Sequence, residues 1–283
     1  LKEIRNRISS VSSTMQITSA MKMVSAAKLK KAQDAITAMR PYADKLTELL
    51  QSLSATLDAD SGSKFSAQRE IKNVLIVPIT SNRGLCGAFN SNIIKHTQHL
   101  ISNVYTGKNV SIVAIGKKGN DAFSKKKIVI ANRSTVFDDL TFDNVAEIAE
   151  MLMDKFVTGE FDKIEIVYNK FKNAATQEVM TEQFLPIVPV EGSVANNSDY
   201  IFEPSKVEIV EELILKSLKT QLYKGVRDSF ASEHGARMTA MHKATDNATE
   251  LRDQLKLTYN KARQAAITNE ILEIVGGAEA LNN

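Results

Sequence analysis

The sequence predicts an α/β protein in which two long terminal helices flank a central domain with a mostly parallel sheet. Residues 2–57 and 206–281 carry apolar side chains at helical spacing and contain few helix breakers. Between them, short apolar runs alternate with amphipathic helical stretches, as in an open parallel sheet with right-handed crossovers. We therefore divide the chain into an N-terminal helix over 1–57, a central α/β domain over 71–190 and a C-terminal helix over 206–283.

The first helix carries a coiled-coil pattern of apolar residues, interrupted near Thr18, Lys22 and Ser25. Pro41 lacks an amide donor and crowds the preceding turn, so we expect a kink or a lost hydrogen bond there. The pattern resumes beyond it. Its members are Ile4, Ile8, Val11, Met15, Leu29, Ala32, Ile36, Met39, Ala43, Leu46, Leu50, Leu53 and Leu57.

Four strands are expected in the central domain because their apolar runs are nearly continuous, as in strands buried on both faces. They are 73–80, 110–115, 128–131 and 164–168, and a fifth, edge strand over 184–190 is limited by Pro186 and Pro189. Helices are expected over 88–102, 119–125 and 144–156, and polar loops over 58–70 and 190–204.

The C-terminal helix is predicted to begin at a capping box formed by Ser205 and Glu208. Gly225 and Gly235 lie inside it, and each costs about 1 kcal/mol relative to alanine. They mark either a break or a close approach to the central domain. At about 1.5 Å per residue the two terminal helices would span roughly 84 Å and 114 Å, so their apolar stripes must pack on each other or on a partner.

The charge distribution is more informative than the net charge of +3, which is too small for a general nucleic-acid binder. Residues 1–40 hold eight basic and two acidic side chains. This excess is either a solvated helix face or a surface that meets an acidic partner. No stretch of 18 or more apolar residues predicts a membrane span. The long N-terminal stripe favours mature structure over a transit peptide, and no secretory signal is expected.

No group of residues predicts bond-making chemistry. The single cysteine, Cys86, excludes an internal disulfide, lacks a neighbouring base and is expected to be a small buried residue in a turn. His96 and His99 lack a third metal ligand. The loops at 81–87 and 116–119 follow strands but match neither glycine-rich phosphate-binding pattern. We therefore predict no catalytic residue, cofactor or metal, and no enzymatic activity for the chain alone.

Three segments together identify a resemblance that covers the whole chain. They are 17–28 (ITSAMKMVSAAK), 81–87 (SNRGLCG) and the stretch from Ala236 through NKARQAAIT to EIVGGAEAL. In this order they resemble the gamma subunit of the F-type ATP synthase. The resemblance implies an antiparallel coiled coil, a Rossmann-like central domain and the function of a central rotating shaft. Such a shaft couples ion-driven rotation of a membrane ring to ATP synthesis or hydrolysis on beta subunits.

The resemblance also implies the partners. One copy would sit with the alpha and beta subunits of the catalytic hexamer, the epsilon subunit and the membrane c-ring, without nucleic acid. The expected location is peripheral, on the cytoplasmic face of a bacterial inner membrane in preference to a mitochondrial one. Whether the coupling ion is a proton or sodium stays open.

Residue by residue, the resemblance places Arg263 and Gln264 in contact with a beta-subunit loop, with Thr268 and Glu270 in the same region. Met21, Lys22 and Arg83 match positions near the acidic lever of the beta subunit. The apolar residues of the tip would turn in a hydrophobic bearing; they are Ile271, Leu272, Ile274, Val275 and Leu281.

Two other classes of protein are compatible with the predicted architecture. A nucleotide-dependent α/β enzyme with coiled-coil dimerisation arms would bind a nucleotide or self-associate through the arms. An arm-bearing chaperone would capture and release unfolded clients. Neither class accounts for the three matching segments.

Overall fold

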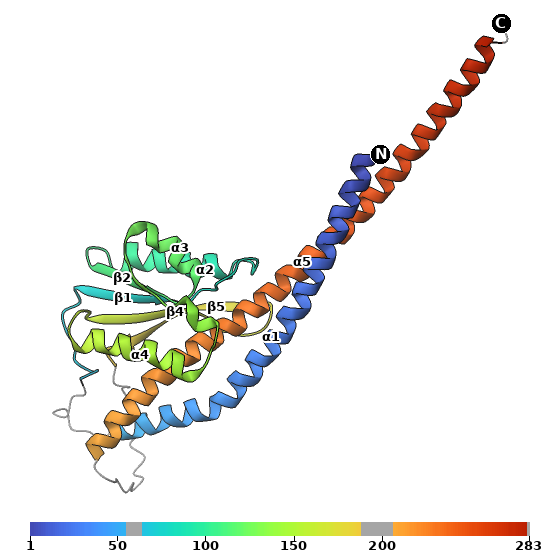
Figure 1. The fold of residues 1–283 in the computed structure, drawn as a ribbon. Helices are drawn as coiled ribbons and strands as arrows, with labels where there is room; N and C mark the ends of the chain where they lie inside the picture. Colours follow the sequence, from blue (N-terminus) through green and yellow to red (C-terminus); the bar gives the residue numbers. More distant parts are fainter. Residues whose placement is uncertain (55–63, 188–205, 282–283) are drawn as a thin grey trace. The chain divides into compact units, whose positions relative to one another are not determined.

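A computed structural model describes residues 1–54, 64–187 and 206–281 (Figure 1). The chain forms two compact units. The terminal unit comprises Leu1–Ser25 and Met238–Asn283, and the sheet unit comprises Ala26–Arg237. Two long helices, α1 and α5, contribute to both units, and each unit has its own contacts.

The predicted terminal helices are confirmed. Helix α1 spans Lys2–Ser54 and continues through Pro41, so the missing amide donor does not end it. Helix α5 spans Lys206–Leu281. The predicted capping residue Ser205 and the last residues of the predicted first helix, 55–57, lie outside the described residues.

Helix α5 runs without a break through both of its internal glycines. A Cβ atom on Gly225 would lie 3.6 Å from the ring of Tyr168. A Cβ on Gly235 would lie only 3.1 Å from the Cα of Ala174. The glycines therefore permit α5 to approach Tyr168 and Ala174 closely, and the alternative of a helix break is wrong.

The sheet unit is built on five strands in the order β3-β2-β1-β4-β5. The first four are mutually parallel, as predicted, and β5 runs antiparallel to β4. Val74 of β1 aligns with Val110 of β2 on one side and with Lys163 of β4 on the other. The strands are β1 Asn73–Pro78, β2 Asn109–Ala114, β3 Val129–Asn132, β4 Lys163–Phe171 and β5 Gln177–Leu185.

The predicted position of the edge strand is wrong. It was expected over 184–190, whereas β5 ends at Leu185 and begins at Gln177. Residues 188–190 lie outside the described part. The sequence of β5 is polar for a strand, and tertiary partners satisfy its polar groups: Tyr168 donates to Glu182, and the ring of His96 lies 2.7 Å from the hydroxyl of Thr181.

The remaining helices form the crossovers between parallel strands. Helix α2 covers Phe89–His99 and ends in a π-helical turn over Leu100–Val104, and α3 covers Lys117–Phe123. Helix α4 covers Phe142–Val157, and its first turn is capped by the Thr141 hydroxyl, which accepts from the Asn144 amide. Short 3-10 turns lie at Ser124–Lys126 and Ser134–Phe137.

Each face of the sheet has its own apolar core. Helices α4 and α5 cover one face, and α2 and α3 cover the other (Figure 1). Helix α5 places a buried residue at every fourth position on this core, because steps of four keep nearly to one side of an α-helix. These residues are Val210, Ile214, Leu218, Leu222 and Val226.

In the terminal unit the two long helices lie side by side and antiparallel (Figure 1). Thr18 contacts Thr245, the hydroxyl of Thr249 lies 3.3 Å from the sulfur of Met15, and Arg5 donates to the hydroxyl of Tyr259. Along these three contacts the residue number decreases in α1 while it increases in α5, so the two helices run antiparallel.

The predicted interruption of the apolar pattern does not interrupt the burial of α1. Thr18 and Ser25 are both buried, and each hydroxyl lies within hydrogen-bond distance of a carbonyl of its own helix. A small hydroxyl residue whose hydroxyl is bonded to a carbonyl of its own helix is buried at little cost. The buried stretch of α1 is therefore longer than its apolar residues alone indicate.

Candidate functional site

The crevice where an open α/β sheet usually binds its ligand is filled by α5. Strand order reverses between β1 and β4, and ligands bind at the carboxyl ends of strands at such a point. Here Ser232 of α5 donates to the carbonyl of Asn169 at 2.9 Å. The hydroxyl of Ser229 lies 3.5 Å from the carbonyl of Ile79. Both serines are buried, so a helix occupies the position that a nucleotide would take.

The loop over 81–87 is held by hydrogen bonds within the loop and from its neighbours in the fold. The Ser81 amide donates to Oδ1 of Asn90, and the Ser81 hydroxyl donates to the carbonyl of Arg83 at 2.6 Å. Leu85 has a φ of 61°, a left-handed conformation that is unfavourable for a residue with a side chain. Cys86 is buried, as predicted, and burial raises the pKa of its thiol.

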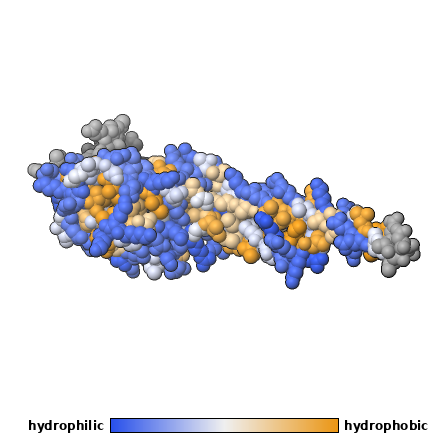
Figure 2. All heavy atoms as spheres, turned by 90° about the horizontal axis from the view of Figure 1, so that it is seen from above, coloured by the Kyte–Doolittle hydropathy of each residue, from blue (hydrophilic) through white to orange (hydrophobic). Residues whose placement is uncertain are grey.

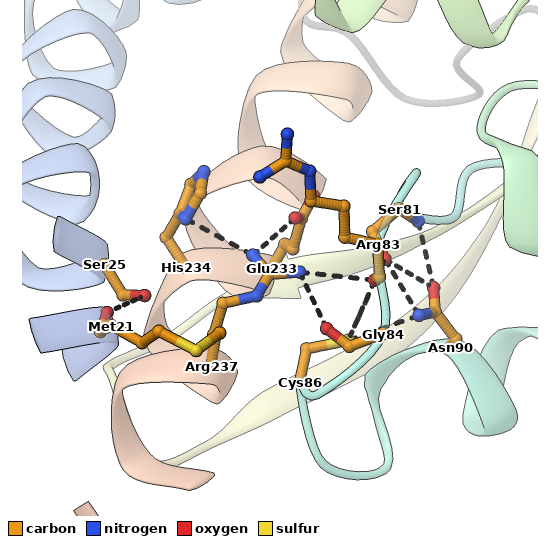
Figure 3. A network of polar contacts seen from close by, with 10 residues as sticks. All are labelled: Met21, Ser25, Ser81, Arg83, Gly84, Cys86, Asn90, Glu233, His234 and Arg237. Atoms are coloured by element: carbon orange, nitrogen blue, oxygen red, sulfur yellow. Dashed lines mark hydrogen bonds and ion pairs between the residues drawn. The ribbon is translucent and has the colours of Figure 1, made fainter. Parts of the chain in front are cut away.

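Helix α5 contacts this loop through a buried ion pair. Nη1 of Arg237 lies 2.6 Å from Oε1 of Glu233, one helical turn earlier (Figure 3). Nη2 of Arg237 donates to the carbonyls of Arg83 and Gly84, both at 3.3 Å. Burial raises the pKa of the Glu233 carboxyl, while the neighbouring guanidinium of Arg237 opposes that shift.

A buried histidine lies beside the ion pair. Nδ1 of His234 is 3.5 Å from Nη1 of Arg237, and the imidazole meets the ring of Phe230 edge to face at 4.5 Å. Burial lowers the pKa of His234 to about 3, and the positive charges of Arg237 and Lys28 act in the same direction. His234 is therefore neutral at physiological pH and adds no charge to this cluster.

The residues predicted to contact a beta-subunit loop share one stretch of α5 in the terminal unit. Arg263, Gln264, Thr268 and Glu270 are all exposed, and the Thr268 hydroxyl donates to the carbonyl of Gln264 at 2.9 Å. Ile271, Leu272, Ile274 and Val275 follow and are also exposed. The Leu281 side chain lies outside the described residues.

The other predicted contact residues belong to different elements. Met21 and Lys22 are half-buried on α1 in the terminal unit, whereas Arg83 is exposed on the 81–87 loop of the sheet unit. The structure of the chain alone thus gathers four of the seven predicted contact residues in two turns of one helix. Their roles toward a partner stay predictions.

Sequence reasoning assigned no role to Glu233, Arg237, Ser229 and Ser232, which connect α5 to the loop and to the crevice. A sequence signal was present, because Glu233 and Arg237 are spaced to pair along a helix. Small polar residues at 229 and 232, with glycines at 225 and 235, also indicate a helix face that contacts backbone closely. What no pattern in one sequence specifies is the distant loop that this face meets.

Within the described ranges, no three or more His, Cys, Asp or Glu side chains are grouped so that they could hold a metal ion. No described helix combines the length and the apolar character that a bilayer span requires. The described residues thus present exposed side chains along the end of α5 and a buried polar cluster where α5 meets the 81–87 loop.

Comparison with known proteins gives matches over the whole chain. A family model described as ATP synthase matches residues 1–281. The ATP synthase gamma chain of Flavobacterium psychrophilum is 77% identical over 282 residues, which cover 99% of this chain and 98% of the relative. The gamma chain of Flavobacterium johnsoniae is 74% identical, with 100% of this chain and 99% of the relative covered.

Solved structures share the fold. A chain in the central stalk and c-ring structure of the Tetrahymena thermophila mitochondrial ATP synthase matches with a TM-score of 0.60 and 25% identity, covering 81% of this chain and 99% of that one. A chain in the rotor of the Euglena gracilis enzyme matches with a TM-score of 0.67 over 94% of this chain and 98% of that one, at 24% identity. Together with the identity to bacterial relatives over the full length, the match to the family model establishes that this chain belongs to the ATP synthase gamma chain family.

Proposed function

We propose that this chain is the central rotating shaft of a bacterial F-type ATP synthase. It couples ion-driven rotation of the membrane ring to ATP synthesis or hydrolysis on the beta subunits. As a gamma chain it is a non-catalytic subunit, and the matches to bacterial gamma chains cover 98% and 99% of those relatives.

The observation that carries this proposal is the exposed stretch of α5 from residue 263 to residue 278. Arg5, near the start of α1, contacts Tyr259 of α5, and every described side chain from 263 to 278 is exposed. That stretch includes exposed Ile271, Leu272, Ile274 and Val275, and Figure 2 shows apolar surface near the grey C-terminal residues. Contiguous exposed apolar residues on a monomer mark a surface for a partner. A surrounding sleeve of other subunits would cover this one.

The polar residues just before the apolar tip suit contacts that form and break. Arg263 presents a planar fork of donors, and Gln264 presents both donors and an acceptor on an exposed helix face. Different sides of a single helix carry different side chains. A rotating helix therefore presents these groups to each beta subunit in turn, and Thr268 and Glu270 extend the same face.

Basic side chains, one of them part of the excess in the first 40 residues, support a second contact. Lys22 is half-buried next to Met21 on α1, and Arg83 is exposed on its loop. These side chains suit an acidic lever on the beta subunit, since opposite charges attract over about one Debye length. Each contact would differ with the angle of the shaft.

The proposed assembly contains one copy of this chain with alpha and beta subunits, an epsilon subunit and a membrane c-ring. The solved neighbours come from a central stalk with its c-ring and from a rotor, which supports this assembly. We place the chain at the periphery of the membrane, on the cytoplasmic face of the bacterial inner membrane. The nucleotide-dependent enzyme is disfavoured because Ser229 and Ser232 of α5 fill the crevice at the strand ends.

Native mass measurement of the endogenous complex tests the proposal. The expected mass corresponds to one copy of this chain with three alpha and three beta subunits. A homodimer, or a complex without alpha and beta subunits, would contradict it. Purified isolated chain is expected to show no ATPase activity, and sustained turnover by it would favour the enzyme alternative instead.

A further inference from the structure

A buried charge on α5 contacts the backbone of a loop that is distant in sequence. Arg237 is 7% exposed, and its Nη2 donates to the carbonyls of Arg83 and Gly84, more than 150 positions away in the chain. The loop carries Arg83, whose side chain is exposed, and Leu85 in a left-handed conformation. A residue in that conformation persists only where surrounding contacts hold it.

Stability alone does not explain the ion pair. Burying two charges is expensive, and well-packed apolar residues of similar volume often serve folding as well or better. Glu233 is 8% exposed and holds one nitrogen of the Arg237 guanidinium at 2.6 Å. This arrangement fixes the plane of the guanidinium and directs its other nitrogen at the loop (Figure 3). An apolar pair would have no donor for the two loop carbonyls.

The loop has a second anchor on its other side. The Ser81 hydroxyl also donates to the carbonyl of Arg83, and the Ser81 amide is held by Asn90 of α2. The carbonyl of Arg83 is thus held from α5 and from the beginning of the loop itself. Figure 3 shows the Arg83 side chain extending from the loop on the side where Glu233 lies.

We infer that Arg237 is a positioning residue, which fastens the 81–87 loop to α5 so that Arg83 is presented to the beta subunit in one fixed direction. Force on Arg83 then passes directly to the long helix. This inference rests on the proposed function, because the presentation of Arg83 matters only if a partner meets it. Glu233 acts through Arg237, by holding its guanidinium plane.

The test uses the complex reconstituted with its alpha and beta subunits and compares three backgrounds, of which the first is the wild-type chain. Arg237→Met with Glu233→Gln removes both charges without leaving a buried carboxylate unpaired. Arg237→Lys keeps the charge but lacks the fork, so it should restore only part of the function. Into each background Arg83→Ala is introduced, and the rate of ATP hydrolysis is measured.

Arg83→Ala is expected to slow hydrolysis about tenfold when Arg237 is present, which corresponds to about 1.4 kcal/mol. In the Arg237→Met, Glu233→Gln background it should change the rate less than about twofold, because Arg83 is already misdirected. Equal effects in both backgrounds would overturn the inference, since a merely structural role of Arg237 gives additive effects. Arg263→Ala, in the other unit, is the control and should be additive in both.

A spin label gives a readout that does not depend on rotation. With Arg83→Cys labelled in the assembled complex, the spectrum should report an immobilised label when Arg237 is present. In the Arg237→Met, Glu233→Gln background it should report a mobile label. Equal mobility would overturn the fastening of the loop. No effect of Arg83→Ala on hydrolysis would overturn the presentation of Arg83 to a partner, while Arg263→Ala would still report separately on the shaft.

Discussion

The hydroxyl oxygens of Thr18 in α1 and Thr245 in α5 lie 2.8 Å apart, at a partly buried contact between two antiparallel helices. Each hydroxyl also lies within hydrogen-bond distance of a carbonyl of its own helix, that of Met15 for Thr18 and that of Met241 for Thr245. The bond joins residues 227 positions apart. A polar contact of this kind fixes which turn of one helix faces which turn of the other.

Replacing this pair should show energetic coupling. Thr18→Val or Thr245→Val alone is expected to lower the free energy of unfolding by about 1 kcal/mol, because the remaining hydroxyl loses its hydrogen bond to the other helix. The double variant should lose less than the sum, by about 0.5–1 kcal/mol. Denaturant unfolding followed by circular dichroism measures this. Thr258→Val is the matched control, because its exposed hydroxyl bonds only within its own helix, and additive effects of the pair would contradict the coupling.

The two glycines of α5 predict opposite outcomes for the same substitution. Gly225→Ala places its Cβ at an ordinary 3.6 Å from Tyr168, so the helix should gain up to about 1 kcal/mol in stability. Gly235→Ala places its Cβ 3.1 Å from the Cα of Ala174, and overpacking of about 1–3 kcal/mol should outweigh the same gain. Unfolding curves of the two variants serve as mutual controls. Equal stability of both would show that close packing does not select Gly235.

His234 should make the stability of the chain depend on pH. Its pKa is about 3 in the folded chain and about 6.5 when unfolded, so the unfolded chain binds one more proton between these values. The free energy of unfolding therefore falls as pH falls below 6.5, by up to about 1.4 kcal/mol per pH unit. Glu233, whose pKa is raised, contributes with the opposite sign nearer its usual value.

The difference between wild type and His234→Gln isolates this effect. The variant should lose most of the slope between pH 6.5 and 5, measured by denaturant unfolding at several pH values. His242→Gln, at an exposed site of the same helix, controls for loss of a histidine. An unchanged slope in His234→Gln would show that the histidine is charged in the folded chain.

The exposed polar pair near the end of α5 should affect turnover and not assembly. Arg263→Ala combined with Gln264→Ala is expected to slow ATP synthesis and hydrolysis at least about tenfold, because each lost charged hydrogen bond is worth about 1.5–3 kcal/mol. Native mass measurement should find the complex intact. Asn269→Ala, an exposed polar neighbour, is the control. Unchanged rates in the double variant would remove Arg263 and Gln264 from the contact site.

Elements with a strong apolar signal were predictable from sequence, and those stabilised by tertiary polar contacts were not. Strands β1, β2 and β4 were predicted because they are buried on both faces and read as continuous apolar runs. Strand β5 was missed over its first residues, because Gln177, Glu178 and Glu182 break any apolar alternation. Their polar groups depend on partners such as Tyr168, which no local pattern reveals.

The candidate site divides in the same way. Arg263 and Gln264 were assigned from the resemblance, and the structure adds that both are exposed on α5. Arg237 was within a matched segment but received no role, because its function depends on two carbonyls that are distant in sequence. Side-chain contacts with backbone leave no periodic signal, so they required the fold.

Observing rotation of this chain directly tests the central claim. With Lys108→Cys in an exposed turn as the attachment point for a bead, and buried Cys86 protected from the label, the surface-fixed complex is supplied with ATP. The bead should turn in one direction, at a speed that rises with the hydrolysis rate. Steady hydrolysis by complexes whose beads stay still would contradict the assignment of this chain as the shaft.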